Sequence, residues 1–266
     1  MTSSRVLLSD SLEGRRGIVT GAGSGIGRVI AHRFIELGAY VVGIGRTADH
    51  LEETRRTSAD PTMFEWITCN VRDQSQVSET ITSIGEKGGL DLLVNCAGGQ
   101  FIAPATAITP NGWRSVHELN LDAIFWTCSA AYPYLAHSGR GAIVNIVLSG
   151  VERGSMGMAH SVSARAGVVG LTRTLAQEWG PKRIRVNCVG PGLVITTKFQ
   201  EYSDASVVDR IVIETPMGRP TEADEVAELI AYLSCDASVM ITGQLLQIDG
   251  GASLSHGLHM LGDPVE

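Results

Sequence analysis

Hydrophobic and polar residues follow two alternating spacings along this chain. Short apolar runs, typical of buried strands, occur between longer segments in which apolar residues recur every three or four positions. The predicted strands cover residues 17–20, 40–44, 63–69, 90–95, 142–147, 185–189 and 245–248. The clearest predicted helices cover residues 26–37, 112–135, 163–179 and 223–234. The order of the segments is therefore strand and helix in alternation.

This alternation predicts an α/β fold: a single doubly wound parallel sheet with helices on both faces, the Rossmann arrangement. No internal repeat or low-complexity linker interrupts the pattern, so we expect one domain over residues 1–266. Residues 196–220 show no strong period and precede a helix, which favours a cover over the active site. The last fifteen residues are expected to be irregular.

Composition narrows the classes of partner. The net charge is −7, which argues against nucleic acid or an anionic membrane as the main partner. No apolar run is long enough to span a membrane, and residues 1–16 lack the apolar run of a signal peptide. A cytoplasmic location is therefore expected. The five cysteines occur without a CxxC pair, which predicts reduced, mostly buried thiols and no metal site.

A glycine-rich turn lies between the first predicted strand and the first predicted helix. Its sequence is Thr20-Gly21-Ala22-Gly23-Ser24-Gly25-Ile26-Gly27, with the spacing TGxxxGxG in place of GxGxxG. Glycines permit a tight turn and let the backbone approach a pyrophosphate at a helix N-terminus. The turn predicts a dinucleotide site, although a plain connection between strand and helix is the alternative interpretation.

The end of the second predicted strand bears on the choice of cofactor. An acidic residue there would bind ribose hydroxyls, whereas an arginine would accept a 2′-phosphate. This chain has Gly45 and Arg46, and no acid before Asp49. A guanidinium can form paired hydrogen bonds with a phosphate, so the sequence favours NADP(H) over NAD(H). The alternative is a solvated loop arginine.

Four further segments extend this pattern: Asn95-Cys96-Ala97-Gly98, Glu118-Leu119-Asn120-Leu121, Pro191 to Thr196, and Ile248-Asp249-Gly250-Gly251. Together with the glycine turn, they resemble the short-chain dehydrogenase/reductase family over almost the whole chain. With Arg46, the cofactor contacts that this resemblance implies are Thr20, Gly21, Gly25, Ile26, Gly27, Asn70, Val71, Asn95, Ala97, Gly98, Arg165, Pro191, Gly192, Val194 and Thr196. Asn70 stands where the family more often has aspartate. The resemblance also implies a homotetramer.

A narrower resemblance lies in the segments Gly98 to Phe101, Asn111 to Trp113, and Gly157 to Gly167. These look like the branch that contains trans-2-enoyl-CoA and dienoyl-CoA reductases. This resemblance implies an acyl-CoA substrate, although bacterial relatives in the same branch are often labelled citronellol or citronellal dehydrogenases, so a carbonyl lipid is the alternative.

The catalytic positions depart from the family's usual Asn, Ser, Tyr and Lys. Asn120 matches the first and would hold a water on a proton relay; its alternative role is to bond the backbone at a helix kink, and both roles are compatible. Leu148 stands at the serine position, with Ser149 beside it. Ser161 stands at the tyrosine position and Arg165 at the lysine position. We expect Asn120, Ser161 and Arg165 to be the catalytic residues.

Ser161 and Arg165 are four residues apart, so they share one helix face. Arg165 can bond ribose hydroxyls and supply positive charge, but it cannot shuttle a proton because its pKa exceeds about 12. His160 is the nearby group that titrates close to neutral pH, but it lies off this face, which favours a structural role. Tyr202, in the predicted cover, is the tyrosine best placed to reach the cleft.

Three functions fit these residues. The preferred hypothesis is an NADP-dependent oxidoreductase that reduces an α,β-unsaturated acyl thioester of the enoyl-CoA type. The second is an alcohol or ketone dehydrogenase acting on a terpenoid or hydroxyacyl compound. The third is an NADP-binding protein without turnover, which the replaced tyrosine suggests and the intact cofactor motifs oppose.

Overall fold

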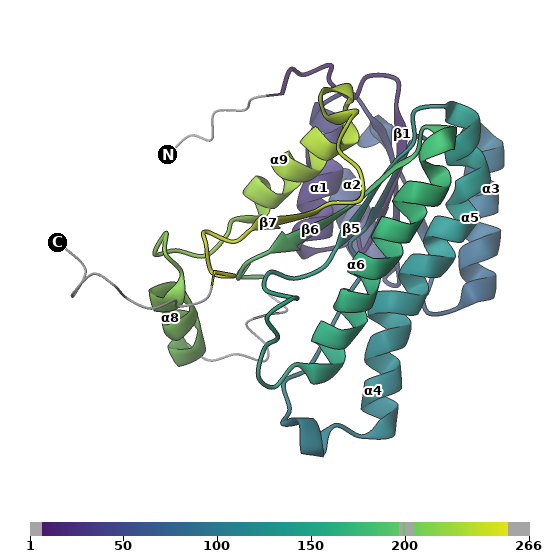
Figure 1. The fold of residues 1–266 in the computed structure, drawn as a ribbon. Coiled ribbons are helices and arrows are strands. Elements are labelled where there is room, and N and C mark those ends of the chain that lie inside the picture. Colours follow the sequence, from purple (N-terminus) through teal and green to yellow (C-terminus); the bar gives the residue numbers. More distant parts are fainter. Residues whose placement is uncertain (1–6, 197–198, 200–204, 255–266) are drawn as a thin grey trace.

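The computed structural model describes residues 7–196, 199 and 205–254. In this part of the chain, seven parallel strands form one sheet in the order β3-β2-β1-β4-β5-β6-β7 (Figure 1). The strands are β1 (Arg16–Thr20), β2 (Tyr40–Gly45), β3 (Phe64–Thr68), β4 (Leu92–Asn95), β5 (Ala142–Ile146), β6 (Arg185–Pro191) and β7 (Leu245–Ile248). Every predicted strand is confirmed. The order reverses between β1 and β4, and such a switch point opens a crevice at the carboxyl ends of the strands.

Helices cover both faces of the sheet, as the sequence predicts. One face carries α1 (Gly25–Glu36), α2 (Ala48–Thr57) and α9 (Ala223–Ser234), and the other carries α3 (Gln74–Gly88), α5 (Ala123–Ser138) and α6 (Ala159–Trp179). Neighbouring strand residues point to opposite faces, so Ile18 packs into one hydrophobic core and Val19 into the other. Leu93 and Leu92 divide in the same way. This double burial is why the strands consist of continuous apolar runs.

The predicted helix over residues 112–135 is a longer composite. It begins with α4 (Pro110–His117), passes through a π-helical turn (Glu118–Asp122) and continues as α5. Thr109 caps the start, since its Oγ1 accepts a hydrogen bond from the Gly112 amide at 3.1 Å. A periodic pattern cannot reveal a π turn, because the turn inserts one residue without adding a break.

Two further segments differ from expectation. Helix α6 begins at Ala159, four residues before the predicted start at residue 163. The apolar pattern missed its first turn because His160 and Ser161 are polar although they are buried. Residues 196–220, which show no strong period, contain helix α8 (Ala205–Glu214). The predicted cover role of this segment stays a prediction, and Tyr202 lies outside the described residues. Of the last fifteen residues, only 252–254 are described.

Candidate active site

The glycine-rich turn joins β1 to α1 at the switch point of the sheet. Gly21 and Gly25 have φ angles of +72° and +51°, which residues with a side chain rarely adopt. No side chain caps the N-terminus of α1, and its first turn carries no acidic residue. The unpaired amides of that turn therefore suit an anionic group, and the residues fit a pyrophosphate.

Neighbouring side chains hold this turn in place. The Thr20 Oγ1 accepts hydrogen bonds from the amides of Cys96 and Ala97, both at 3.0 Å, and so joins the turn to the end of β4. From the other side, Arg28 donates to the Gly23 carbonyl at 2.7 Å, and Thr54 donates to the Ala22 carbonyl at 2.9 Å. The turn is thus fixed by protein contacts alone, which makes it a preorganised site.

The residues expected at the adenine end of the cofactor follow the carboxyl ends of β2 and β3. Arg46 directly follows β2, is exposed, and forms no hydrogen bond or ion pair with any residue that the structure describes. Asn70 follows β3 by two residues, and its Oδ1 accepts from the Arg72 amide at 3.3 Å. Val71 beside it is buried. The strand order therefore brings Arg46 and Asn70 to the same edge of the sheet.

Asn95 differs from the other predicted cofactor contacts, because its side chain belongs to the core. Its Nδ2 donates to the Asn145 Oδ1 at 2.8 Å, and its Oδ1 accepts from the Thr127 hydroxyl at 2.7 Å. Asn145 continues the chain of hydrogen bonds to Thr172 at 2.9 Å. Any contact of Asn95 with a cofactor must therefore come from its backbone, which leads into Ala97 and Gly98.

The segment after β6 returns to the glycine-rich turn. Gly192 donates its amide to the Ile248 carbonyl at 3.0 Å, and the Leu193 carbonyl accepts from the Thr221 amide at 2.8 Å. Val194 packs against the core, while the Thr196 methyl lies 3.4 Å from the position that a Cβ on Gly25 would take. Two segments that the sequence assigns to one cofactor thus lie close together.

Asn120 lies in the π-helical turn and is buried. Its Nδ2 donates to the carbonyls of Gly99 and Val116 at 2.8 and 2.7 Å, and its Oδ1 accepts from the Gly99 amide at 3.1 Å. This geometry is that of an asparagine bonding the backbone at a helix irregularity. The second lone pair of Oδ1 is the position left for the expected water.

Ser161 and Arg165 lie on one face of α6, as their spacing predicts, and they also form a hydrogen-bonded pair. The Arg165 Nη1 donates to the Ser161 Oγ, and Ser161 donates in turn to the Gln100 Oε1 at 2.9 Å. A Cβ on Gly98 would lie 3.0 Å from the Asn120 Oδ1 and 3.3 Å from the Arg165 Nη2. The three predicted catalytic residues therefore lie around one short segment, and sequence reasoning gave no role to Gln100 within it.

The tyrosines that the structure describes have other surroundings. Tyr40 donates to Glu65 at 3.2 Å, Tyr132 packs on Trp179 with ring centroids 4.9 Å apart, and Tyr232 donates to the Ala237 carbonyl at 3.5 Å. Tyr134 packs against Gly85 of α3. Within the described residues, no tyrosine therefore stands in for the phenol that Ser161 replaces.

His160 is fully buried beside Ser161, with its ring edge-on to Phe101 at a centroid distance of 4.2 Å. Neither ring nitrogen makes a hydrogen bond of normal geometry. Burial lowers the pKa of His160 below its ordinary value, and the charges of His117 and Arg165 act in the same direction, while the Met158 backbone partly opposes them. These surroundings favour a neutral, packed histidine.

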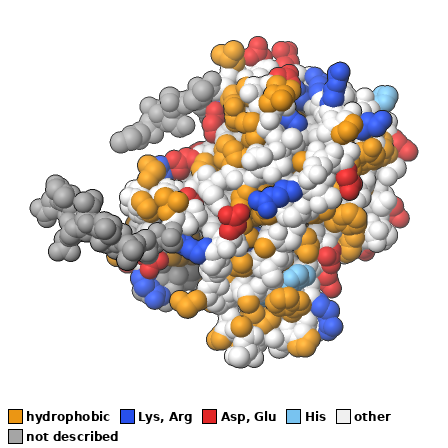
Figure 2. Space-filling model, viewed as in Figure 1, with side chains coloured by type: hydrophobic (Ala, Val, Ile, Leu, Met, Phe, Trp, Pro, Cys, Tyr) orange, Lys and Arg blue, Asp and Glu red, His pale blue; other side chains and the backbone are white. Residues whose placement is uncertain are grey.

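The rim of the site is apolar. Phe101 and Ile102, from the segment after β4, and Met156, from the segment before α6, are exposed. The two segments are joined because the Ala103 amide donates to the Gly157 carbonyl at 3.0 Å. Hydrophobic side chains gather at this lower end of the molecule in Figure 2, where α4 and α6 begin.

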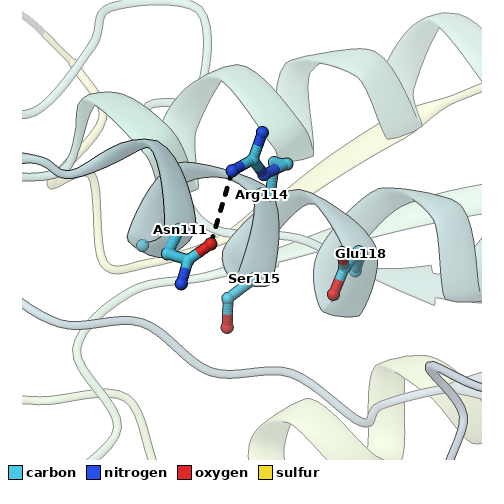
Figure 3. Close-up of a pocket in the computed structure, with 5 residues that line it drawn as sticks. Asn111, Arg114, Ser115 and Glu118 are labelled. Atoms are coloured by element: carbon cyan, nitrogen blue, oxygen red, sulfur yellow. Dashed lines mark hydrogen bonds between the residues drawn. The ribbon is translucent and has the colours of Figure 1, made fainter.

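A separate hollow of about 400 Å³ lies along α4 and the π turn, lined by Asn111, Gly112, Arg114, Ser115 and Glu118 (Figure 3). Arg114 donates to the Asn111 Oδ1 at 3.3 Å, and Arg72 donates to the Ser115 carbonyl at 2.9 Å. None of the residues expected to bind cofactor or substrate lines it. The hollow therefore does not belong to the candidate site.

The cysteines are free thiols and most of them are buried. All five are free, four of them are buried, and burial raises the pKa of Cys128 to about 12 and that of Cys188 to about 11. The described residues include no group of three or more His, Cys, Asp or Glu that could hold a metal ion. Over the same residues, no helix is both long and apolar enough to cross a membrane.

Comparisons with known proteins found relatives over most of the chain. The family described as enoyl-(acyl carrier protein) reductase matches residues 21–253. A Bacillus subtilis (strain 168) protein named "Probable 2,4-dienoyl-CoA reductase" is 36% identical over 253 residues, covering 92% of this chain and 98% of that protein. The 3-oxoacyl-(acyl-carrier-protein) reductase of Thermotoga maritima is 33% identical, covering 90% and 98%.

Solved structures show the same relationship. A short chain dehydrogenase from Bacillus anthracis superposes with a TM-score of 0.83 at 34% identity, covering 91% of this chain and 98% of that one. The sheet, the glycine-rich turn and these similarities identify the chain as a member of the short-chain dehydrogenase/reductase family, whose members are oxidoreductases that bind NAD(H) or NADP(H) and act on small molecules.

Proposed function

We propose that this protein is an NADP(H)-dependent reductase of α,β-unsaturated acyl thioesters of the enoyl-CoA type. The observation that carries the proposal is the pair formed by Arg165 and Ser161, where the family's usual lysine and tyrosine would stand. This pair offers a fixed positive charge and no phenolic acid. The name of the Bacillus subtilis relative supports the same class of substrate.

The proposed cofactor site uses the residues described above. The N-terminus of α1, with Gly21 to Gly27, would hold the pyrophosphate, and Arg46 the 2′-phosphate. Asn70 and Val71 would frame the adenine, and the backbone of Asn95 to Gly98 would support its ribose. Pro191 to Thr196 would lie against the nicotinamide carboxamide. Arg165 would bond the nicotinamide ribose, and NADPH, when bound, supplies a hydride.

The choice of substrate follows from what the residues can stabilise. A hydride added to a ketone leaves a basic alkoxide, for which a positioned general acid typically contributes about 10²–10⁴-fold. A hydride added to the β-carbon of an enoyl thioester moves the double-bond electrons into an enolate, whose charge is delocalised and less basic. Hydrogen bonds and a nearby cation can carry that charge. Arg165 would supply the cation, Asn120 would hold a water, and the α-carbon would take its proton from water.

A ketone or alcohol dehydrogenase of a hydroxyacyl or terpenoid substrate is the second candidate. The similarity to a 3-oxoacyl reductase favours it, because that relative is named for reduction of a ketone. Binding of NADP without turnover is the third candidate, and it rests on the replaced tyrosine alone.

The test is oxidation of NADPH with three substrate series at matched concentration: trans-2-enoyl-CoAs, 3-ketoacyl-CoAs and simple ketones. The proposal expects the enoyl series to be fastest. Ketone reduction without enoyl reduction would favour the second candidate, and tight NADPH binding without any turnover would favour the third. We further propose that each chain forms one domain and that the protein is a cytoplasmic homotetramer. Light scattering can test the tetramer, because it measures the mass of the assembly.

A further inference from the structure

We propose that Gln100 is a positioning residue that fixes Arg165 through Ser161. The catalytic part of this inference rests on the proposed function, whereas its effect on cofactor binding does not. Gln100 lies in the segment after β4, and 61 positions separate it from Ser161 in the chain. Its Oε1 is 2.9 Å from the Ser161 Oγ, and the Ser161 Oγ is in turn bonded to Arg165.

The directions of these hydrogen bonds follow from the groups themselves. A guanidinium can only donate, so the Ser161 oxygen must accept from Arg165. Ser161 has one hydroxyl proton, and the Gln100 Oε1 is the acceptor that takes it. If the amide were turned to present Nε2, Ser161 would face two donors and its proton would lose this acceptor. The side chain of Gln100 therefore has one favourable orientation.

Burial makes each of these bonds consequential. Ser161 is fully buried and Arg165 is 9% exposed, so water cannot easily replace a missing partner. Without the acceptor on Gln100, the buried Ser161 proton would lose this partner, and the Ser161 Oγ would no longer be held in one position to accept from Arg165.

The same short segment contacts all three candidate catalytic residues. Gly98 leaves room for the Arg165 Nη2, and Gly99 bonds Asn120 through both its amide and its carbonyl. Gln100 completes the series through Ser161. Residues 98–100 thus act as one template that sets the relative positions of Asn120, Ser161 and Arg165.

This arrangement assigns Ser161 a role different from that of a proton donor. Its proton is committed to Gln100, and its oxygen is the acceptor that aims Arg165. The substrate's proton must then come from elsewhere, in agreement with protonation from water.

The first experiment compares two substitutions of similar size. Gln100→Met removes the acceptor, whereas Gln100→Glu keeps an oxygen that can accept from Ser161. We expect Gln100→Met to weaken NADPH binding about five- to tenfold, the effect of one buried hydrogen bond, and to lower turnover, while Gln100→Glu, which keeps the acceptor, retains most of the NADPH binding. Gln177→Met is the matched control, because Gln177 is exposed on the same helix as Ser161 and should leave binding unchanged.

Binding of 2′,5′-ADP separates positioning from general damage. This fragment lacks the nicotinamide ribose, so Gln100→Met should leave its dissociation constant unchanged. Equal weakening of NADPH and 2′,5′-ADP would show a merely structural role and overturn the inference. If Gln100→Met fails to fold, Gln100→Asn keeps the amide but shortens its reach and should give the same pattern.

A double-mutant cycle tests the route through Ser161. In a Ser161→Ala background, Gln100→Met should cause no further loss of NADPH affinity, because the link is already broken. Fully additive losses, or unchanged NADPH affinity in Gln100→Met alone, would overturn the inference. These titrations need no substrate, so they remain decisive even if the protein reduces no enoyl thioester.

Discussion

The methyl group of Thr196 lies 3.4 Å from the position that a Cβ on Gly25 would occupy. Gly25 begins the helix after β1, and Thr196 belongs to the segment after β6. Two segments that are far apart in the chain therefore lie close together at the switch point of the sheet.

Gly25→Ala is expected to weaken NADPH binding by at least about tenfold, since the φ of +51° costs about 1–2 kcal/mol for a residue with a side chain, and relief of that strain would move the turn. Gly139→Ala is the matched control, because Gly139 also has a left-handed φ, at +68°, but caps α5 away from the turn. Thermal melts and NADPH titrations check both. If the two variants lose equal stability and neither loses affinity, Gly25 has no role in binding.

Arg46→Ala should weaken NADPH binding about 10- to 100-fold and leave NADH binding unchanged, because a charged hydrogen bond contributes about 1.5–3 kcal/mol. Arg56→Ala is the control: Arg56 is exposed on α2 and pairs with Glu53. The test is to measure the dissociation constants of NADPH and NADH for the unmodified protein and for both variants. Equal affinities for NADPH and NADH in the unmodified protein would refute the preference for NADP(H).

Arg165→Met should weaken NADPH binding and lower turnover by about 10- to 100-fold, because it removes a charged donor beside Gly98. Arg165→Lys should retain part of both, since it keeps the charge but loses the planar group that bonds Ser161. Steady-state kinetics and titration measure the two effects separately. Full activity in Arg165→Met would mean that the match of this position to the family's lysine is wrong.

The buried His160 predicts a pH dependence of stability. Its folded pKa lies below the ordinary value of 6.5, so the unfolded chain binds the proton more readily. The contribution of neutral His160 to the free energy of unfolding is fully present above about pH 6.5. It is lost as the pH falls from there through the folded pKa of His160. As the pH is lowered from about 6.5 through the folded pKa of His160, the free energy of unfolding should therefore fall less steeply in His160→Leu than in the unmodified protein. Urea titrations across this range check it, and parallel curves would contradict the account.

Most of the sheet was predictable, because strands buried on both faces consist of continuous apolar runs. Ile18 and Val19 show the reason, since each enters a different core. The helix boundaries were less predictable. Ser161 is polar yet buried, so the apolar period could not include the first turn of α6.

The sequence predicts which positions form the candidate site, but it does not predict how their side chains are arranged. The spacing of Ser161 and Arg165 predicted that they share one helix face, because four residues make about one helical turn, and the structure shows that they also bond each other. The partner of Ser161 could not be predicted, because Gln100 approaches from a loop and no period relates the two residues. The π turn at Asn120 was also hidden, because it inserts one residue without interrupting the helical segment.

The destination of the hydride tests the central claim most directly. With NADPH deuterated at nicotinamide C4 and a trans-2-enoyl-CoA in ordinary water, the account predicts a saturated acyl-CoA with deuterium on its β-carbon. With unlabelled NADPH in deuterium oxide, deuterium should appear on the α-carbon. Mass spectrometry and NMR of the product locate each label. No deuterium in any product of the enoyl-CoA, with deuterium on the carbinol carbon when a 3-ketoacyl-CoA is supplied in its place, would contradict the account.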